Sequence, residues 1–136
     1  MAGRIKPVTK KVILLVEDPP LDTEFTLRAL EKFHGKFDIL VAQDGWDALI
    51  LMKHQEFDLI LLELKMPTMT GFETMVSMKT YQLQGDIPLL ILSNSDIATD
   101  RERGRELGAA GYIHKSSDFT QFKNALQSVI EQHSYL

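Results

Sequence analysis

The sequence predicts an α/β protein in which helices cover both faces of a five-stranded parallel sheet. Short apolar segments recur five times along the chain, and the stretches between them are long enough for helices with apolar residues at helical spacing. Strands that alternate with helices in this way pair in parallel, because each helix returns the chain across the sheet. With 136 residues and 44% hydrophobic content, the chain is expected to form one domain with an ordinary core.

The predicted strands are the apolar segments themselves, at residues 12–16, 38–42, 59–62, 89–92 and 110–113. Helix-start signals lie between them: Asp44-Gly45 precedes the second helix, Thr70-Gly71 opens the third, and Asp118 is a candidate cap of the last. Residues 1–10 are polar and basic and are expected to form a flexible N-terminal tail. The domain is therefore assigned to residues 11–136.

Composition narrows the classes of function. The net charge of −4 argues against a general surface for nucleic acid or anionic membranes. The absence of cysteine excludes disulfides and thiolate metal sites. No apolar run approaches the roughly 20 residues that span a bilayer, and the N-terminal segment lacks the apolar core of a signal peptide. A cytoplasmic protein that binds neither nucleic acid nor membrane is expected.

Acidic residues follow two of the predicted strands. The first strand runs into Glu17 and Asp18, and the third delivers Glu63 before Lys65-Met66-Pro67 breaks the strand. Because the carboxyl ends of parallel strands meet at one edge of a sheet, the three carboxylates are expected to converge there. A cluster of carboxylates of this kind indicates either a bound cation or a functional site.

Five short sequence motifs, in their order and spacing, together resemble the CheY-like receiver domain of two-component response regulators over nearly the whole chain. They are Glu17-Asp18, the run Leu64-Lys65-Met66-Pro67, the helix start Thr70-Gly71-Phe72-Glu73, Ser93 and Lys115. The resemblance implies a flavodoxin-like fold with strand order 2-1-3-4-5 and a site at the C-terminal ends of the strands. It also implies a module of phosphorelay signal transduction rather than an enzyme.

The resemblance implies a role for each site residue. In the family, an aspartate at the end of the third strand accepts a phosphoryl group, and that position is Glu63 here. Mg²⁺ would be held by Glu17, Asp18, Glu63 and the backbone carbonyl of Lys65, with weak or absent binding left open. Lys115 would pair with the acceptor or its phosphate, and Ser93 would hydrogen-bond the phosphoryl oxygens. Ser93 and Tyr112 match the family's switch pair.

Glutamate at position 63 departs from the family pattern. It is one methylene longer than aspartate, and a misplacement of about 1 Å can cost roughly a hundredfold in rate, so phosphorylation of Glu63 is expected to be impaired. The longer side chain extends a negative charge toward the place of a phosphate and would mimic it incompletely. An alternative is a decayed site, in which Glu63 only forms a salt bridge with Lys115.

The implied partners are a sensor histidine kinase or phosphotransfer protein, a downstream protein target, or both, and a homodimer is left open. On the second helix, Trp46 and Ile50 share a face and are candidates for an exposed partner surface, with a Trp packed against its own helix as the alternative. The competing functions are a conventional phosphoacceptor receiver and a flavodoxin-like cofactor-binding protein. The acidic, proline-containing loop after the first strand is a poor phosphate cradle, which disfavours the second.

Overall fold

The computed structural model describes residues 10–18 and 21–135, and the predicted tail lies outside this part of the chain except for Lys10. Within it, the strands are β1 (Lys11–Val16), β2 (Phe37–Ala42), β3 (Leu59–Glu63), β4 (Leu89–Ser93) and β5 (Gly111–His114). They pair in parallel in the order β2-β1-β3-β4-β5. The predicted fold class is confirmed.

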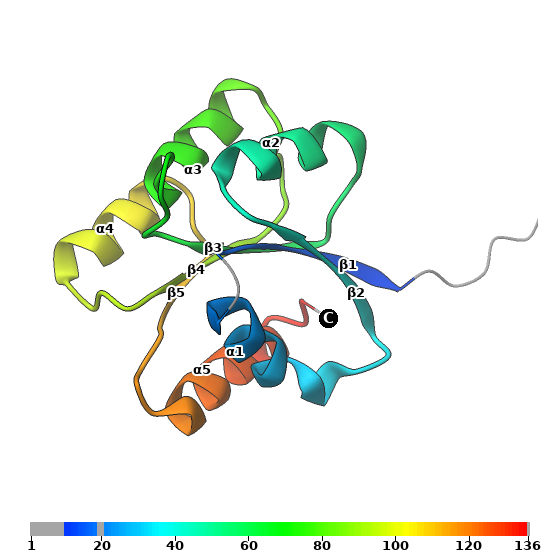
Figure 1. Cartoon of the computed structure of the whole chain (residues 1–136), viewed down its shortest axis with the longest axis vertical. Helices are drawn as coiled ribbons and strands as arrows, with labels where there is room; N and C mark the ends of the chain where they lie inside the picture. The colour runs from blue at the N-terminus through cyan, green and yellow to red at the C-terminus, as the bar shows by residue number, and fades with distance from the viewer. Residues whose placement is uncertain (1–9, 19–20, 136) are drawn as a thin grey trace, which may run out of the picture.

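The helices are α1 (Leu21–Ala29), α2 (Gly45–His54), α3 (Gly71–Thr80), α4 (Ala98–Glu106) and α5 (Phe119–Gln132), with a short 3₁₀ helix η1 (Glu31–Phe33) after α1. Figure 1 shows α1 and α5 on one face of the sheet and α2, α3 and α4 on the other. The arrangement follows from the parallel sheet, which is buried on both faces. None of the helices in the described part is both long and apolar enough to cross a membrane.

Side chains of the central strands alternate between two cores. Leu14, Ile60 and Ile91 point toward the α2–α3 side, whereas Ile13, Leu61 and Leu90 point toward α1 and α5. The strands are apolar throughout because both of their faces are covered. Every residue of β3 and β4 is buried, which fixes the ends of these strands rigidly where the site lies.

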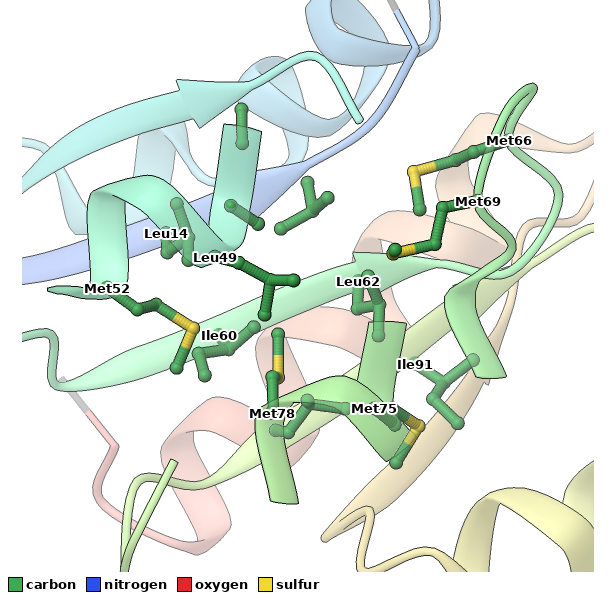
Figure 2. Packing of buried hydrophobic residues seen from close by; sticks show 14 of the residues in the cluster. Leu14, Leu49, Met52, Ile60, Leu62, Met66, Met69, Met75, Met78 and Ile91 are labelled. Atoms are coloured by element: carbon green, nitrogen blue, oxygen red, sulfur yellow. The ribbon is translucent and has the colours of Figure 1, made fainter. Parts of the chain in front are cut away.

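Methionines fill much of the core between the sheet and the helices α2 and α3. Figure 2 shows their thioethers packed among Leu49, Leu62 and Ile91. The methionines of this cluster are Met52, Met66, Met69, Met75 and Met78. Unbranched, flexible side chains suit such an irregular gap, so these residues are core filler.

The predicted helix starts are confirmed by hydrogen bonds. Asp44 caps α2 by accepting from the amide of Asp47, and Asp118 caps α5 by accepting from the amide of Thr120. Thr70 and Glu73 form a reciprocal capping box at the start of α3. These caps fix the helix entries at the loops that follow β2, β3 and β5.

Trp46 and Ile50 lie on α2 and are 53% and 56% exposed. Their neighbours Ala48, Leu49 and Met52 form the buried face of the helix. An apolar pair therefore faces outward, and its role as a partner surface stays a prediction.

Candidate functional site

Two glutamates and a lysine come together at the C-terminal ends of the strands. Glu17 directly follows β1, Glu63 is the last residue of β3, and Lys115 directly follows β5. Because β1 and β3 are neighbours with Val16 opposite Leu62, the two glutamates lie side by side on adjacent strand ends. All three side chains are buried, with at most 5% of any residue exposed.

The Lys115 ammonium bridges the two carboxylates. Its Nζ lies 2.5 Å from Oε2 of Glu17 and 2.7 Å from Oε1 of Glu63. Charge-assisted hydrogen bonds of this length are about twice as strong as neutral ones, and burial removes most of the screening by water. The ion pair between residues 63 and 115 is thus an organising contact of the site.

Both carboxylates have further partners. Oε2 of Glu63 accepts hydrogen bonds from the backbone amides of Leu64 and Lys65, at 2.8 and 3.2 Å. Oε2 of Glu17 also accepts from the Thr26 hydroxyl at 3.0 Å. Oε1 of Glu17 is the exception, since it is buried without a hydrogen-bond partner among the described residues. The carboxylate of Glu63 is therefore fixed at both of its oxygens.

Gly71 allows the loop after β3 to fold closely over Glu63. A Cβ atom at position 71 would lie 2.5 Å from the backbone oxygen of Glu63 and 2.7 Å from Cα of Leu64. Both of these atoms belong to the backbone and cannot move aside cheaply. The Thr70-Gly71 helix start thus helps to hold the Glu63 backbone in place, and the amide of Gly71 bonds to the carbonyl of Leu64.

Burial changes the acidity of Glu17. Desolvation raises the pKa of Glu17 from its ordinary value near 4.5 to about 7, although Lys115 and Thr26 act in the opposite direction. For Lys115, burial alone would lower the pKa, but the adjacent carboxylates of Glu17 and Glu63 raise it above its ordinary value. Lys115 is accordingly a firmly protonated cation at neutral pH.

The other predicted site residues lie outside this triad. Asp18 follows Glu17 but is exposed. Ser93, at the end of β4, is fully buried, and its Oγ accepts a hydrogen bond from the amide of Ser95. No hydrogen bond joins the Ser93 side chain to Glu63 within residues 10–18 and 21–135. The structure therefore brings Glu17, Glu63 and Lys115 together and leaves Asp18 and Ser93 beside them.

Tyr112 is held at two points. Its hydroxyl donates to the backbone carbonyl of Ser95 at 2.6 Å, and the Arg101 guanidinium lies over its ring at 4.7 Å from the centroid. Arg101 is itself paired with Asp96 at 2.5 Å. Sequence reasoning missed two contacts, that of Arg101 with Tyr112 and that of Thr26 with Glu17, because no motif in the chain marks either of them.

The side chains of Glu17 and Glu63, two of the predicted Mg²⁺ ligands, are engaged by other groups of the protein in this arrangement. In the described part of the chain, no group of three or more acidic or histidine side chains is placed to hold a metal ion. Both oxygens of Glu63 are already bonded, and the Lys115 ammonium lies between the two buried carboxylates. Mg²⁺ requires near-octahedral oxygen ligation, and Oε1 of Glu17 is the oxygen of this pair of carboxylates that has no hydrogen-bond partner among the described residues.

The fold and site define a class of protein: an α/β domain with a buried acid–lysine site at the carboxyl edge of its sheet. The family model of the response regulator receiver domain matches residues 13–127. The chain belongs to that family, and it is a receiver module of two-component signalling. The family and the fold implied by the resemblance are thereby confirmed.

Individual relatives agree with this assignment. The chain is 28% identical over 118 residues to protein PilH of Pseudomonas aeruginosa, an alignment that covers 87% of this chain and 96% of PilH. It is 34% identical over 110 residues to the gliding motility regulatory protein of Myxococcus xanthus, covering 80% of this chain and 14% of that protein. The chain spans less than half the length of several curated relatives that it matches.

Solved structures show the same fold. The phosphorylated cyanobacterial phytochrome response regulator RcpA is similar with a TM-score of 0.80 and 27% identity, covering 90% of this chain and 93% of that one. The Mn²⁺-bound response regulator Rcp1 is similar with a TM-score of 0.77 and 27% identity, covering 89% of this chain and 92% of that one. Receivers similar to this chain therefore include phosphorylated and metal-bound proteins.

Proposed function

We propose that this chain is an atypical receiver in which Glu63 occupies the phosphoacceptor position without accepting a phosphoryl group, and which signals by protein–protein contact. The observation that carries this proposal is the 2.7 Å contact between Oε1 of Glu63 and the Lys115 ammonium inside a buried site. The pairing uses the carboxylate as a fixed partner of the lysine. A nucleophilic carboxylate would instead need an oxygen available to an incoming phosphorus.

The hydrogen bonds of Glu63 oppose phosphorylation. Attack on a phosphodonor requires a near-attack geometry at about 3–3.5 Å, and an added methylene shifts the carboxylate from the place that aspartate would take. The oxygen that does not contact Lys115 accepts from two backbone amides. Attack through Oε2 would have to break one of these two hydrogen bonds, and attack through Oε1 would have to proceed beside the Lys115 ammonium.

Glu63 also holds the module in one state. A phosphoryl group brings nearly two negative charges and three acceptor oxygens, whereas a carboxylate brings one charge and two oxygens. Glu63 engages Lys115, while the Ser93 hydroxyl is bonded within its own loop. The site therefore copies the lysine contact of a phosphorylated acceptor and omits the hydroxyl contact, which makes the mimicry partial.

Partner contacts follow from this arrangement. A sensor histidine kinase or a phosphotransfer protein would bind without leaving a stable phosphoryl group on Glu63. A downstream protein would bind the single state in which Glu63 contacts Lys115. The exposed pair Trp46 and Ile50 on α2 is a candidate contact surface. Any activity or partner of a longer protein that contains this chain is likewise a matter of proposal.

The proposal is tested by intact mass spectrometry after incubation with a small acyl-phosphate donor and Mg²⁺. The native chain is expected to gain no phosphoryl mass. The Glu63→Asp variant, which shortens the carboxylate by one methylene and keeps its charge, is expected to gain one phosphoryl group. The variant restores the family residue in the same pocket and is therefore the matched control.

A phosphoryl group mapped to Glu63 of the native chain would overturn the proposal and make the chain a conventional phosphoacceptor. A phosphoryl group in neither protein would show that shortening residue 63 is not sufficient to restore the reaction. In that case the remainder of the site, including the Ser93 and Lys115 loops, would have lost the chemistry as well.

A further inference from the structure

A cation already lies at the centre of the acidic site. The Lys115 ammonium is within 2.7 Å of one carboxylate oxygen from each glutamate, and each residue of the triad is at least 95% buried. Burying carboxylates costs several kcal/mol unless an opposite charge and hydrogen bonds compensate. Lys115 supplies that compensation from within the chain.

The oxygens that a metal would need are mostly occupied. Of the four carboxylate oxygens of Glu17 and Glu63, three accept hydrogen bonds or an ammonium contact, and only Oε1 of Glu17 does not. One buried oxygen is far short of an octahedral shell, and Asp18, the next acidic residue, is exposed. A divalent ion could enter only by displacing the ammonium.

The overall charge of the site also disfavours binding of a divalent cation. The buried site holds two carboxyl groups and one ammonium, and Lys115 contacts both of the glutamates. The ammonium therefore offsets much of the negative charge that a metal ion would meet. That leaves little electrostatic attraction for a divalent cation.

We infer that Lys115 is the resident cation of this receiver site and takes the place of the divalent metal, so that the native chain binds Mg²⁺ and Mn²⁺ only weakly. The inference concerns the same site as the proposed function, and it distinguishes this chain from the similar receiver Rcp1, which was solved with Mn²⁺ bound. It rests on the placement of Lys115 between Glu17 and Glu63 and does not depend on any phosphodonor.

The test is a Mn²⁺ titration followed by electron paramagnetic resonance, which reports the free ion, together with the melting temperature in Mg²⁺ at constant ionic strength. The native chain is expected to leave the free Mn²⁺ signal and the melting temperature unchanged. Lys115→Met keeps an unbranched apolar stem and removes the ammonium, leaving two carboxylates without their cation. This variant is expected to bind Mn²⁺ at least about tenfold more tightly than the native chain, and its melting temperature is expected to rise with Mg²⁺.

Two further variants keep the test decisive. Glu63→Asp draws one carboxylate back from Lys115 without removing the ammonium, and it is expected to bind Mn²⁺ more tightly than the native chain even if Lys115→Met does not fold. Lys36→Met removes an exposed lysine away from the site and is expected to behave like the native chain. This last variant controls for the change in net charge.

Saturable binding of Mn²⁺ by the native chain at an affinity equal to that of the variants would overturn the inference. Failure of every folded variant to bind would also overturn it, because Lys115 would then not be what keeps the metal out. Neither readout uses a phosphodonor, so a failure here is distinguishable from a failure of the proposed function, which is measured as phosphoryl mass.

Discussion

Lys115→Met is expected to lower the free energy of unfolding by about 3–5 kcal/mol, the usual cost of removing one partner from a buried ion pair. The reason is that Glu17 and Glu63 would remain buried next to each other without the ammonium that now contacts both. Chemical denaturation at pH 7, followed by far-ultraviolet circular dichroism, measures this change. The loss should be among the largest for any single side chain outside the apolar core.

Lys36→Met is the matched control, since this lysine is exposed, and its loss is expected to change stability by less than about 0.5 kcal/mol. A loss for Lys115→Met no larger than that of the control would mean that the buried triad does not stabilise the fold. Such a result would contradict the geometry on which the site description rests.

The second large expected effect is a loss of stability as the pH rises through neutrality. The pKa of Glu17 is raised to about 7 in the folded protein, against an ordinary value near 4.5. The folded state therefore binds more protons than the unfolded state between these values, and stability falls as Glu17 ionises. The contribution of Glu17 is present below about pH 4.5 and is lost as the pH passes 7, amounting to about 3 kcal/mol in total.

Glu17→Gln isolates this contribution from the other titrating groups, because it copies the shape of a protonated carboxyl and cannot ionise. The free energy of unfolding of the variant, relative to the native chain, is expected to rise between pH 5 and pH 8 by up to about 3 kcal/mol. A relative fall over the same range would show that attraction by Lys115 outweighs the desolvation of Glu17.

Most of the fold could be predicted from the sequence because its signals are local. Apolar runs such as residues 59–62 are long enough for strands and too short for helices, and turn and capping residues separate them. Asp44 could be placed at a helix start and Asp118 as a helix cap because such signals depend on a few neighbouring residues. The observed boundaries of the strands differ from the predicted ones by a single residue or less at each end.

The site could be predicted only in part, since it depends on contacts between distant residues. The strand ends predict that Glu17, Asp18 and Glu63 converge at one edge of the sheet, and the resemblance to receiver domains adds Lys115 as the partner of residue 63. The sequence does not reveal that Thr26 reaches Glu17 from α1, or that Arg101 covers Tyr112 from α4. These contacts are set by how each helix is rotated against the sheet, and no motif in the chain marks them.

The sequence also did not reveal which of the acidic residues are buried and which are exposed. Glu17 and Asp18 are adjacent in sequence, yet the first is fully buried and the second is exposed. The pairing of Ser93 with the amide of Ser95 depends on the loop after β4, whose conformation the sequence does not specify. The predicted contacts of Ser93 with phosphoryl oxygens and of Asp18 with a metal ion stay predictions.

The central claim is that Glu63 is bound by Lys115 within the buried site, and a double-mutant cycle tests it most directly. Glu63→Gln, Lys115→Met and the combined variant would be compared with the native chain by chemical denaturation at pH 7. The two residues are expected to be coupled by about 2–3 kcal/mol, so that the double variant loses clearly less stability than the sum of the single losses. Additive losses, within about 0.5 kcal/mol, would contradict the account.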